Sequence, residues 1–445
     1  MKTVLRSLYL TYLLDRRAVA AKRVFAEAIR ILFFRKRIVS VFLQLDDPYS
    51  YLLGHYLTHV LKTYPKVEFK FYLCQGLRGD FMPEPAQLAE YALIDCKLLA
   101  REFGIPFLDK GSTPAVEFRR PLLEFLAAEQ DEDDFAETLI TALTHYWRGD
   151  AEAVTRVMGR TYGESAETNV LVGRNQLLLR KMGHYHCATM HYQGEWYWGV
   201  DRLRLLLDRL DAQGQNRFEV PLSELASLDQ AMQMHLPATV PTKAESLPPL
   251  EVFHSFRSPY SYIALQKAFD IAGAFGLTLE VKPVLPMVER GMKVPKSKIL
   301  YIVKDANRVA MDNGIPFGKI ADSKGVGAER CIAGFYYAKT QNRERDFLLE
   351  AGKAIFAEAI DVATDEGMQI VAERSGLFWP ELQEALQDEA WRDQAKVNSE
   401  ELSEVGLWGV PTLKIGKQAF WGQDRDWLAA RMIEDLCHGG EGIII

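Results

Sequence analysis

The sequence has few cysteines, no excess of positive charge and no long apolar run, and each absence excludes a class of protein. Its five cysteines stand alone, without a Cys-x-x-Cys pair, which argues against a dithiol oxidant and favours a reducing, cytoplasmic compartment. The net charge of −7 gives no signature of nucleic-acid binding. No apolar run reaches the roughly 18 residues of a membrane-spanning helix. We therefore expect a cytoplasmic globular protein, and 445 residues favour two domains.

Residues 1–37 differ in charge from the rest of the chain. They hold ten of the 53 lysines and arginines but two of the 60 aspartates and glutamates. The segment has no clear signal-peptide cleavage site. Two interpretations stay open for this basic helical segment. It is either a surface helix packed on the first domain, or an interfacial helix that makes a weak contact with an anionic membrane surface.

The chain repeats itself. Three blocks recur in the same order at separations of 211, 210 and 223 residues, which is hard to obtain by chance. We therefore predict a tandem duplication of one domain. The paired blocks are Val41–Leu52 with Val252–Ile263, Tyr91–Phe107 with Tyr301–Phe317, and Gly183–Arg202 with Gly406–Arg425.

The predicted boundaries are a first domain at 38–211, a partly ordered linker rich in proline and polar residues at 212–247, and a second domain at 248–445. Each domain reads as a strand (Ser40–Leu45; Glu251–Phe256), a helix started by proline, a second strand, several helices, a hairpin and a last helix. This order predicts an α/β protein of two thioredoxin-like domains, each with a helical insertion.

The corner after the strand at Glu251–Phe256 carries the clearest local signal. Pro259 suits the first position of a helix, and the hydroxyl of Ser258 can cap that helix. Redox proteins often place a cysteine pair at such a corner, whereas this chain has Ser258-Pro259-Tyr260-Ser261. On the residues alone, Ser258 is either a cap or a cap that also serves a site.

Residues 248–437 resemble the DsbA-like thioredoxin family, in the branch of 2-hydroxychromene-2-carboxylate isomerase and kappa-class glutathione transferase. The resemblance rests on "SPYSY" from Ser258, on "GIPF", on "AIFAEAIDV" and on the closing "GVPTLKIGKQAFWGQDR". Residues 38–211 match more weakly. The resemblance implies that glutathione is the cofactor and that the Ser258 hydroxyl donates a hydrogen bond to its sulfur. A thiolate at a helix N-terminus is also stabilised by the helix dipole.

The resemblance implies two further site elements. Pro411 is expected to be cis and to expose the backbone of Val410, which can pair with an extended peptide. Gln423 and Asp424 are expected to hold the γ-glutamyl end of glutathione, Gln423 at its carboxylate and Asp424 at its ammonium. The structural alternative for Pro411 is an ordinary strand-entry proline. Asp424 could cap the last helix, a role that does not exclude the first.

The sequence departs from the family pattern in the loop after the second strand of the second domain. Relatives often have an asparagine there that helps to bind glutathione, and this loop has none. Three lysines, Lys293, Lys296 and Lys298, are either contacts for an anionic ligand or a solvated basic face.

The first domain has lost the predicted site residues. Asp47 replaces Ser258 and would repel a thiolate, while Ala188 replaces Pro411 and Val200 replaces Gln423. We expect this domain to be structural, so that the chain is a monomeric pseudo-dimer or forms a homodimer. His184, His186, Cys187 and His191 could ligate a metal, but we predict a strand there and favour packed histidines over a metal site.

These features favour an isomerase or transferase that uses glutathione on a small hydrophobic or aromatic substrate. Phe256, Tyr260, Trp408 and Trp421 could line its groove. One alternative is a thiol–disulfide oxidoreductase, for which Cys331 is the best candidate thiol, although its helix predicts burial. The other is a non-catalytic binding or scaffold protein.

Overall fold

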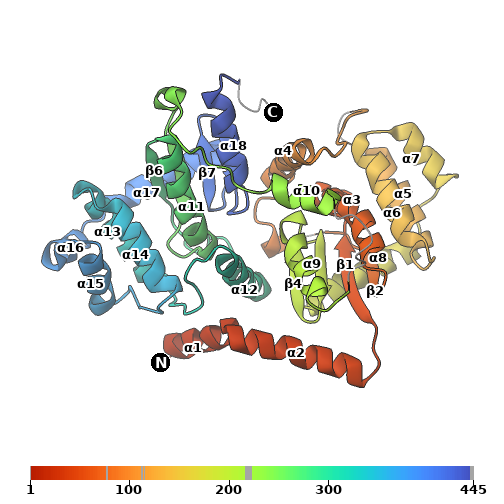
Figure 1. The fold of residues 1–445 in the computed structure, drawn as a ribbon, viewed down its shortest axis with the longest axis horizontal. Coiled ribbons are helices and arrows are strands. Elements are labelled where there is room, and N and C mark those ends of the chain that lie inside the picture. Colours follow the sequence, from red (N-terminus) through yellow and green to blue (C-terminus); the bar gives the residue numbers. More distant parts are fainter. Residues whose placement is uncertain (1, 77–78, 112–113, 115, 216–222, 441–445) are drawn as a thin grey trace. The chain divides into compact units, whose positions relative to one another are not determined.

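The computed structural model describes residues 2–440 except 77–78, 112–113, 115 and 216–222, so part of the predicted linker lies outside the described residues. The chain divides into two compact units, one of Met1–Lys22 with Met234–Ile445 and one of Arg23–Gln233 (Figure 1). Within the described residues, no helix is both long enough and apolar enough to cross a membrane.

The unit of residues 23–233 contains a four-stranded sheet in the order β2-β1-β3-β4. β1 is parallel to β2 and antiparallel to β3, so that Val41 lies opposite Phe71 on one side and Met190 on the other. The elements are β1 (Arg37–Leu43), α3 (Pro48–Thr63), β2 (Val67–Leu73), η1 (Gly79–Phe81), α4 (Pro85–Phe103), α5 (Val116–Glu129), α6 (Phe135–Arg148), α7 (Ala151–Met158), α8 (Ala166–Lys181), β3 (Thr189–Tyr192), β4 (Glu195–Trp198), η2 (Val200–Arg202), α9 (Leu203–Asp211) and α10 (Ser223–Ala231).

The unit that holds residues 234–440 contains a second four-stranded sheet, with the corresponding order β6-β5-β7-β8. β5 is parallel to β6 and antiparallel to β7, and β7 and β8 form the predicted hairpin. The elements are η3 (Thr242–Ser246), β5 (Leu250–His254), α11 (Pro259–Phe275), β6 (Leu279–Pro283), α12 (Lys296–Asp312), α13 (Val326–Thr340), α14 (Glu344–Phe356), α15 (Asp365–Arg374), α16 (Trp379–Ala385), α17 (Trp391–Glu404), β7 (Thr412–Ile415), β8 (Gln418–Trp421) and α18 (Asp426–Cys437).

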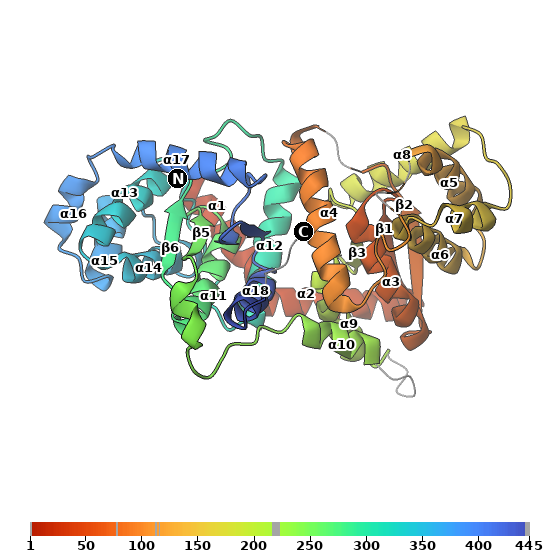
Figure 2. The ribbon, with the colours of Figure 1, turned by 90° about the horizontal axis from the view of Figure 1, so that it is seen from above.

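Helices pack on the sheet of this second unit and build its core. α11 contacts β5 and β6, and α17 contacts β6 (Figure 2). α18 contacts β7 and β8. The central strand β5 is buried because Val252 and Phe253, whose side chains point to opposite faces of the sheet, are both fully covered. Layers of helix on a mixed sheet with this strand order make the unit a thioredoxin-like α/β fold, as predicted.

Each unit also contains a partly buried polar contact, and the two contacts occupy corresponding positions. The Tyr49 hydroxyl lies 2.8 Å from an oxygen of Asp95, and the Tyr260 hydroxyl lies 2.8 Å from an oxygen of Asp305. These pairs tie the first helix after the central strand to the next long helix. The same sheet order and the same cross-helix pair confirm two thioredoxin-like units, while their origin by duplication stays a prediction.

The N-terminal segment forms two helices, α1 (Lys2–Leu14) and α2 (Arg16–Leu32). α1 packs against α12, where the Asn307 amide donates to the Leu14 carbonyl at 3.2 Å. In the loop that follows α12, the Ile320 carbonyl accepts from the Ser7 hydroxyl at 2.6 Å. The expectation that this segment packs on the first domain is therefore wrong for α1, whose partners belong to the second half of the chain.

Candidate functional site

Ser258 caps the N-terminus of α11, a helix of 17 residues. Its extended backbone places the hydroxyl oxygen 3.1 Å from the Ser261 amide, from which it accepts a hydrogen bond. Pro259 occupies the first helical position, where its missing N–H leaves no bond unmade. The capping prediction is confirmed, and the half-buried Ser258 hydroxyl sits at the positive end of a helix dipole.

The Val410–Pro411 peptide bond is cis, as predicted, and Val410 faces Ser258. The Ser258 hydroxyl is 3.5 Å from the Val410 carbonyl oxygen, at the outer limit of hydrogen bonding. A bond of that length is weak, so the hydroxyl hydrogen can turn to a better acceptor at low cost. The corner therefore offers a donor that the protein itself holds only loosely.

Gln423 and Asp424 lie beside Pro411 because the Gly422 amide donates to the Pro411 carbonyl at 2.9 Å. Gly422 has a φ of 111°, which favours glycine there. The buried Gln423 amide nitrogen donates to the Asp424 carboxylate. The Gln423 carbonyl oxygen is also buried and has no hydrogen-bond partner among the described residues. The N-cap residue of α18 is Arg425, so the alternative in which Asp424 caps this helix is not what the structure has.

The site also contains two residues that the sequence analysis missed. Arg290, in the loop after β6, donates to the Trp408 carbonyl at 2.6 Å, and burial lowers the pKa of its guanidinium. Ser255 is buried, and its hydroxyl has no partner among the described residues. One signal in the sequence pointed to the Arg290 loop, which was the absence of the expected asparagine. No signal pointed to Ser255, because a serine three residues before the cap belongs to no motif.

The predicted aromatic groove is only partly assembled. The rings of Trp408 and Trp421 pack with their centres 4.8 Å apart. Gly409 makes room for the Trp421 ring, because a Cβ at position 409 would lie 2.3 Å from it. Tyr260 is half-buried and engaged with Asp305. Phe256 and Trp408 are instead core residues that are 2% and 5% exposed, so the prediction that they line a groove is wrong.

The three lysines are divided between the loop and the start of α12. Lys293 and Lys296 are exposed, whereas Lys298 is half-buried. Burial lowers the pKa of the Lys298 ammonium. Lys298 therefore differs from a solvated basic face, and Lys296 begins the helix.

The corresponding corner of the other unit has a different chemistry. Asp47 caps α3, where its carboxylate accepts hydrogen bonds from the Tyr49 amide at 3.3 Å and from the Ser50 hydroxyl at 2.7 Å. Burial raises the pKa of the Asp47 carboxyl to about 6, although the bond from Ser50 opposes this shift. Ala188, where the other unit has the cis proline, has a φ of 53°, and Val200 is buried.

The histidines near Ala188 are packed. His184 and His186 precede β3, so the prediction that they lie in a strand is wrong, although His191 does lie in β3. His184 is 1% exposed, and His186 stacks on Trp198 with ring centres 4.4 Å apart. The part of the chain that the structure describes contains no group of three or more candidate metal ligands.

The thiols are all buried. Cys331 is 0% exposed, and burial raises the pKa of its thiol far above the ordinary value. Cys187 packs with Cys74, whose hydrogen bond, together with burial, raises the pKa of the Cys187 thiol. The thiols of Cys331 and Cys187 are therefore held in the unreactive, protonated form.

A serine-capped helix that faces a cis proline on a thioredoxin-like sheet defines a class of thioredoxin-fold domain in which an alcohol occupies the helix N-terminus. Residues 249–431 match the family model of the DSBA-like thioredoxin domain. The second half of the chain is thus similar to a DSBA-like thioredoxin domain.

Two curated relatives are 2-hydroxychromene-2-carboxylate isomerases. The protein from Pseudomonas putida is 25% identical over 196 residues, which cover 42% of this chain and 95% of the relative. The protein from Sphingobium xenophagum is 26% identical over 194 residues, which cover 42% of this chain and 98% of the relative.

Solved structures match one unit of the chain. A structure of 2-hydroxychromene-2-carboxylate isomerase has a TM-score of 0.39 and 24% identity, and the match covers 43% of this chain and 97% of that one. The cytosolic disulfide reductase DsbM from Pseudomonas aeruginosa, solved with GSH, has a TM-score of 0.34 and 17% identity, with coverage of 43% and 100%.

Proposed function

We propose that this protein is a glutathione-dependent isomerase or transferase that acts on a small hydrophobic or aromatic substrate, in the manner of 2-hydroxychromene-2-carboxylate isomerase. The observation that carries the proposal is the Ser258 hydroxyl at the N-terminus of α11, 3.5 Å from the Val410 carbonyl oxygen. The names of the relatives that match this half of the chain support it.

The proposed role of Ser258 is to hold the thiol of glutathione as a thiolate. A charge-assisted hydrogen bond from the hydroxyl and the positive end of the α11 dipole both favour the anion and lower the pKa of the thiol. When bound, glutathione would supply the sulfur nucleophile that adds to a conjugated substrate and leaves again. The Val410 backbone would pair with the extended tripeptide as an added strand.

The residues beside Pro411 fit the γ-glutamyl end of the tripeptide. The buried carbonyl oxygen of Gln423 accepts hydrogen bonds only, and it has no donor among the described residues. An ammonium group would satisfy it, and the Asp424 carboxylate beside it adds the opposite charge. We therefore assign the ammonium to both residues, which revises the expectation that Gln423 holds the carboxylate.

The two alternatives differ in what they require. A thiol–disulfide oxidoreductase needs an accessible thiol, and the burial of Cys331 opposes that role. A scaffold protein needs no small-molecule site. In such a protein, a buried Gln423 oxygen without a hydrogen-bond partner would destabilise the fold and serve no function.

Calorimetric titration with reduced glutathione tests the proposal, with S-methylglutathione as the matched ligand that lacks an ionisable thiol. Run in two buffers of different ionisation enthalpy at neutral pH, the titration should show that glutathione binds with release of a proton and that the methylated ligand binds without one. If both ligands fail to bind at millimolar concentration, the proposal is wrong. Binding of both without proton release would remove the thiolate and leave only a peptide site.

A further inference from the structure

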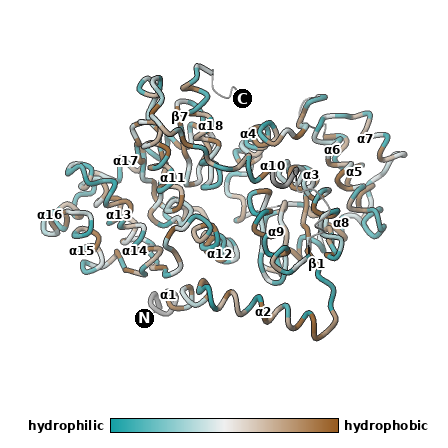
Figure 3. Tube along the Cα trace, in the orientation of Figure 1, coloured by the Kyte–Doolittle hydropathy of each residue, from teal (hydrophilic) through white to brown (hydrophobic). Residues whose placement is uncertain are grey.

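Helix α2 turns an apolar face to solvent, which reverses the usual arrangement of a surface helix. Positions 24, 28 and 31 follow one another at helical spacing, with 25 and 32 beside them, and all are exposed. The turn that follows the helix extends this surface, and Figure 3 shows the apolar end of α2. The apolar face consists of Val24, Phe25, Ile31, Leu32, Phe33 and Phe34, all of them exposed large hydrophobic residues.

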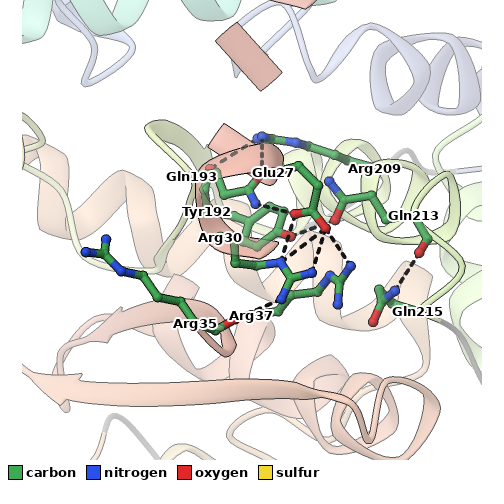
Figure 4. A network of polar contacts seen from close by, with 9 residues as sticks. All are labelled: Glu27, Arg30, Arg35, Arg37, Tyr192, Gln193, Arg209, Gln213 and Gln215. Carbon is green, nitrogen blue, oxygen red and sulfur yellow. Dashed lines mark hydrogen bonds and ion pairs between the residues drawn. The ribbon is translucent and has the colours of Figure 1, made fainter. Parts of the chain in front are cut away.

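The polar side of α2 is the side that faces the protein. Arg23 forms two 2.7 Å hydrogen bonds to the Glu195 carboxylate in β4. Glu27 accepts from Arg30, from Arg37 at 2.6 Å and from the Gln193 side chain at 2.9 Å, a network seen from close by in Figure 4. The hydrogen bonds of Arg30 and Gln193 and the charge of Arg37 outweigh burial and lower the pKa of the Glu27 carboxyl. Ion pairs thus fix which face of α2 points outward.

The end of α2 gives a second, independent sign that the apolar face serves a contact. Phe34 has a φ of 50°, in the left-handed region where glycine is the usual residue after a helix. The Arg35 amide donates to the Arg30 carbonyl at 2.9 Å and closes the turn around it. Phe34 is 95% exposed, so the folded chain gains nothing from a phenylalanine at this strained position.

The charges around this face are positive. Arg16, Arg17, Lys22, Arg35 and Lys36 flank the apolar positions, and Glu27, the acidic residue between 16 and 36, is held in the inward network. We propose that the apolar face of α2, with this basic rim, docks on the surface of an anionic lipid bilayer. Its aromatic and aliphatic side chains would enter the headgroup boundary while the arginines and lysines bind lipid phosphates.

The charge of this face also favours a lipid surface over a second copy of the chain as its binding partner. Two copies that met through this face would bring two basic rims together, and like charges at close range oppose association. The remainder of the chain is acidic, with 43 basic and 58 acidic residues outside 1–37, so it would be repelled by the lipid and would leave α2 as the contact.

Vesicle co-sedimentation of the full chain tests the proposal. The vesicles are phosphatidylcholine alone, or phosphatidylcholine with phosphatidylserine, at low and high salt. The double variant Val24→Glu/Leu32→Glu has a matched control in Val170→Glu/Leu177→Glu, and each pair lies on one helix. Val24 and Val170 are both 71% exposed, and Leu32 and Leu177 are 70% and 62% exposed. A second variant, Arg16→Glu/Arg17→Glu, is compared with Lys66→Glu/Lys396→Glu, which changes the net charge equally.

We expect binding to the phosphatidylserine vesicles alone, weakened by salt and reduced about tenfold or more by both α2 variants but by neither control. Three results would overturn the proposal: no sedimentation with either vesicle, sedimentation that the α2 variants leave unchanged, or a dimer in ultracentrifugation that Val24→Glu/Leu32→Glu dissociates while vesicles bind nothing. None of these results depends on glutathione binding.

Discussion

Replacing Ser258 by alanine separates the structural role of the hydroxyl from its proposed chemical role. The substitution removes the 3.1 Å bond to the Ser261 amide, and loss of a serine cap costs about 1 kcal/mol of unfolding free energy. It also removes the donor to the thiolate. A hydrogen bond to a charged group contributes about 1.5–3 kcal/mol, so the pKa of the bound thiol should rise by about 1–2 units. The dipole of α11 remains, which limits the loss.

The chain offers a matched control in Ser165, the N-cap of α8. Its hydroxyl accepts from the Thr168 amide at the same 3.1 Å. Ser165→Ala should therefore cost a similar ~1 kcal/mol in urea unfolding. Only Ser258→Ala should weaken glutathione binding at neutral pH, by about 10- to 100-fold in calorimetry. The reasoning is refuted if Ser258→Ala binds glutathione as the wild type does, or if Ser165→Ala loses as much affinity.

Three further predictions follow from the same structure. Ser258→Cys should add one thiol that reacts rapidly with an aromatic disulfide, since the five native cysteines are buried and react slowly; a variant without a fast thiol would contradict the helix-dipole argument. Gly352→Ala should lose about 1–3 kcal/mol in urea unfolding, because its Cβ would lie 2.4 Å from the Tyr262 ring, whereas Gly273→Ala, with no described atom within 4 Å, should gain up to about 1 kcal/mol; equal effects would refute the packing account. Asp47→Asn should be more stable than the wild type by up to about 3 kcal/mol above pH 6 and no more stable near pH 4, since a carboxyl whose folded pKa is raised from 3.8 to about 6 destabilises the fold as pH rises through that window; a pH-independent difference would refute it.

Local chemistry explains which parts of the site could be predicted from the sequence. A serine before a proline after an apolar strand specifies a capped helix, whatever the rest of the chain does. The turn at Gly416 and Lys417 specifies the β7–β8 hairpin in the same way. The cis bond at Pro411 came from the family resemblance, since no local pattern distinguishes it from a trans bond.

The missed features depend on contacts between distant residues. Arg290 reaches a carbonyl 118 positions away, and α1 bonds to Ile320, which is 313 positions from Ser7. Neither pairing leaves a periodic or spacing signal in one sequence. The orientation of α2 could be predicted only in part. The sequence shows that the segment is basic, but its polar side faces the protein because of contacts with Glu195 and Gln193 in the hairpin β3–β4.

The measurement that tests the central claim most directly is the pKa of glutathione's thiol in the complex, followed by the ultraviolet absorbance of the thiolate as pH is raised. The corner at Ser258 predicts that the bound thiol ionises well below the about 8.5 of an ordinary thiol, and that Ser258→Ala moves the midpoint back toward that value. A bound thiol that ionises like the free one, in the wild type as in the variant, would contradict the account.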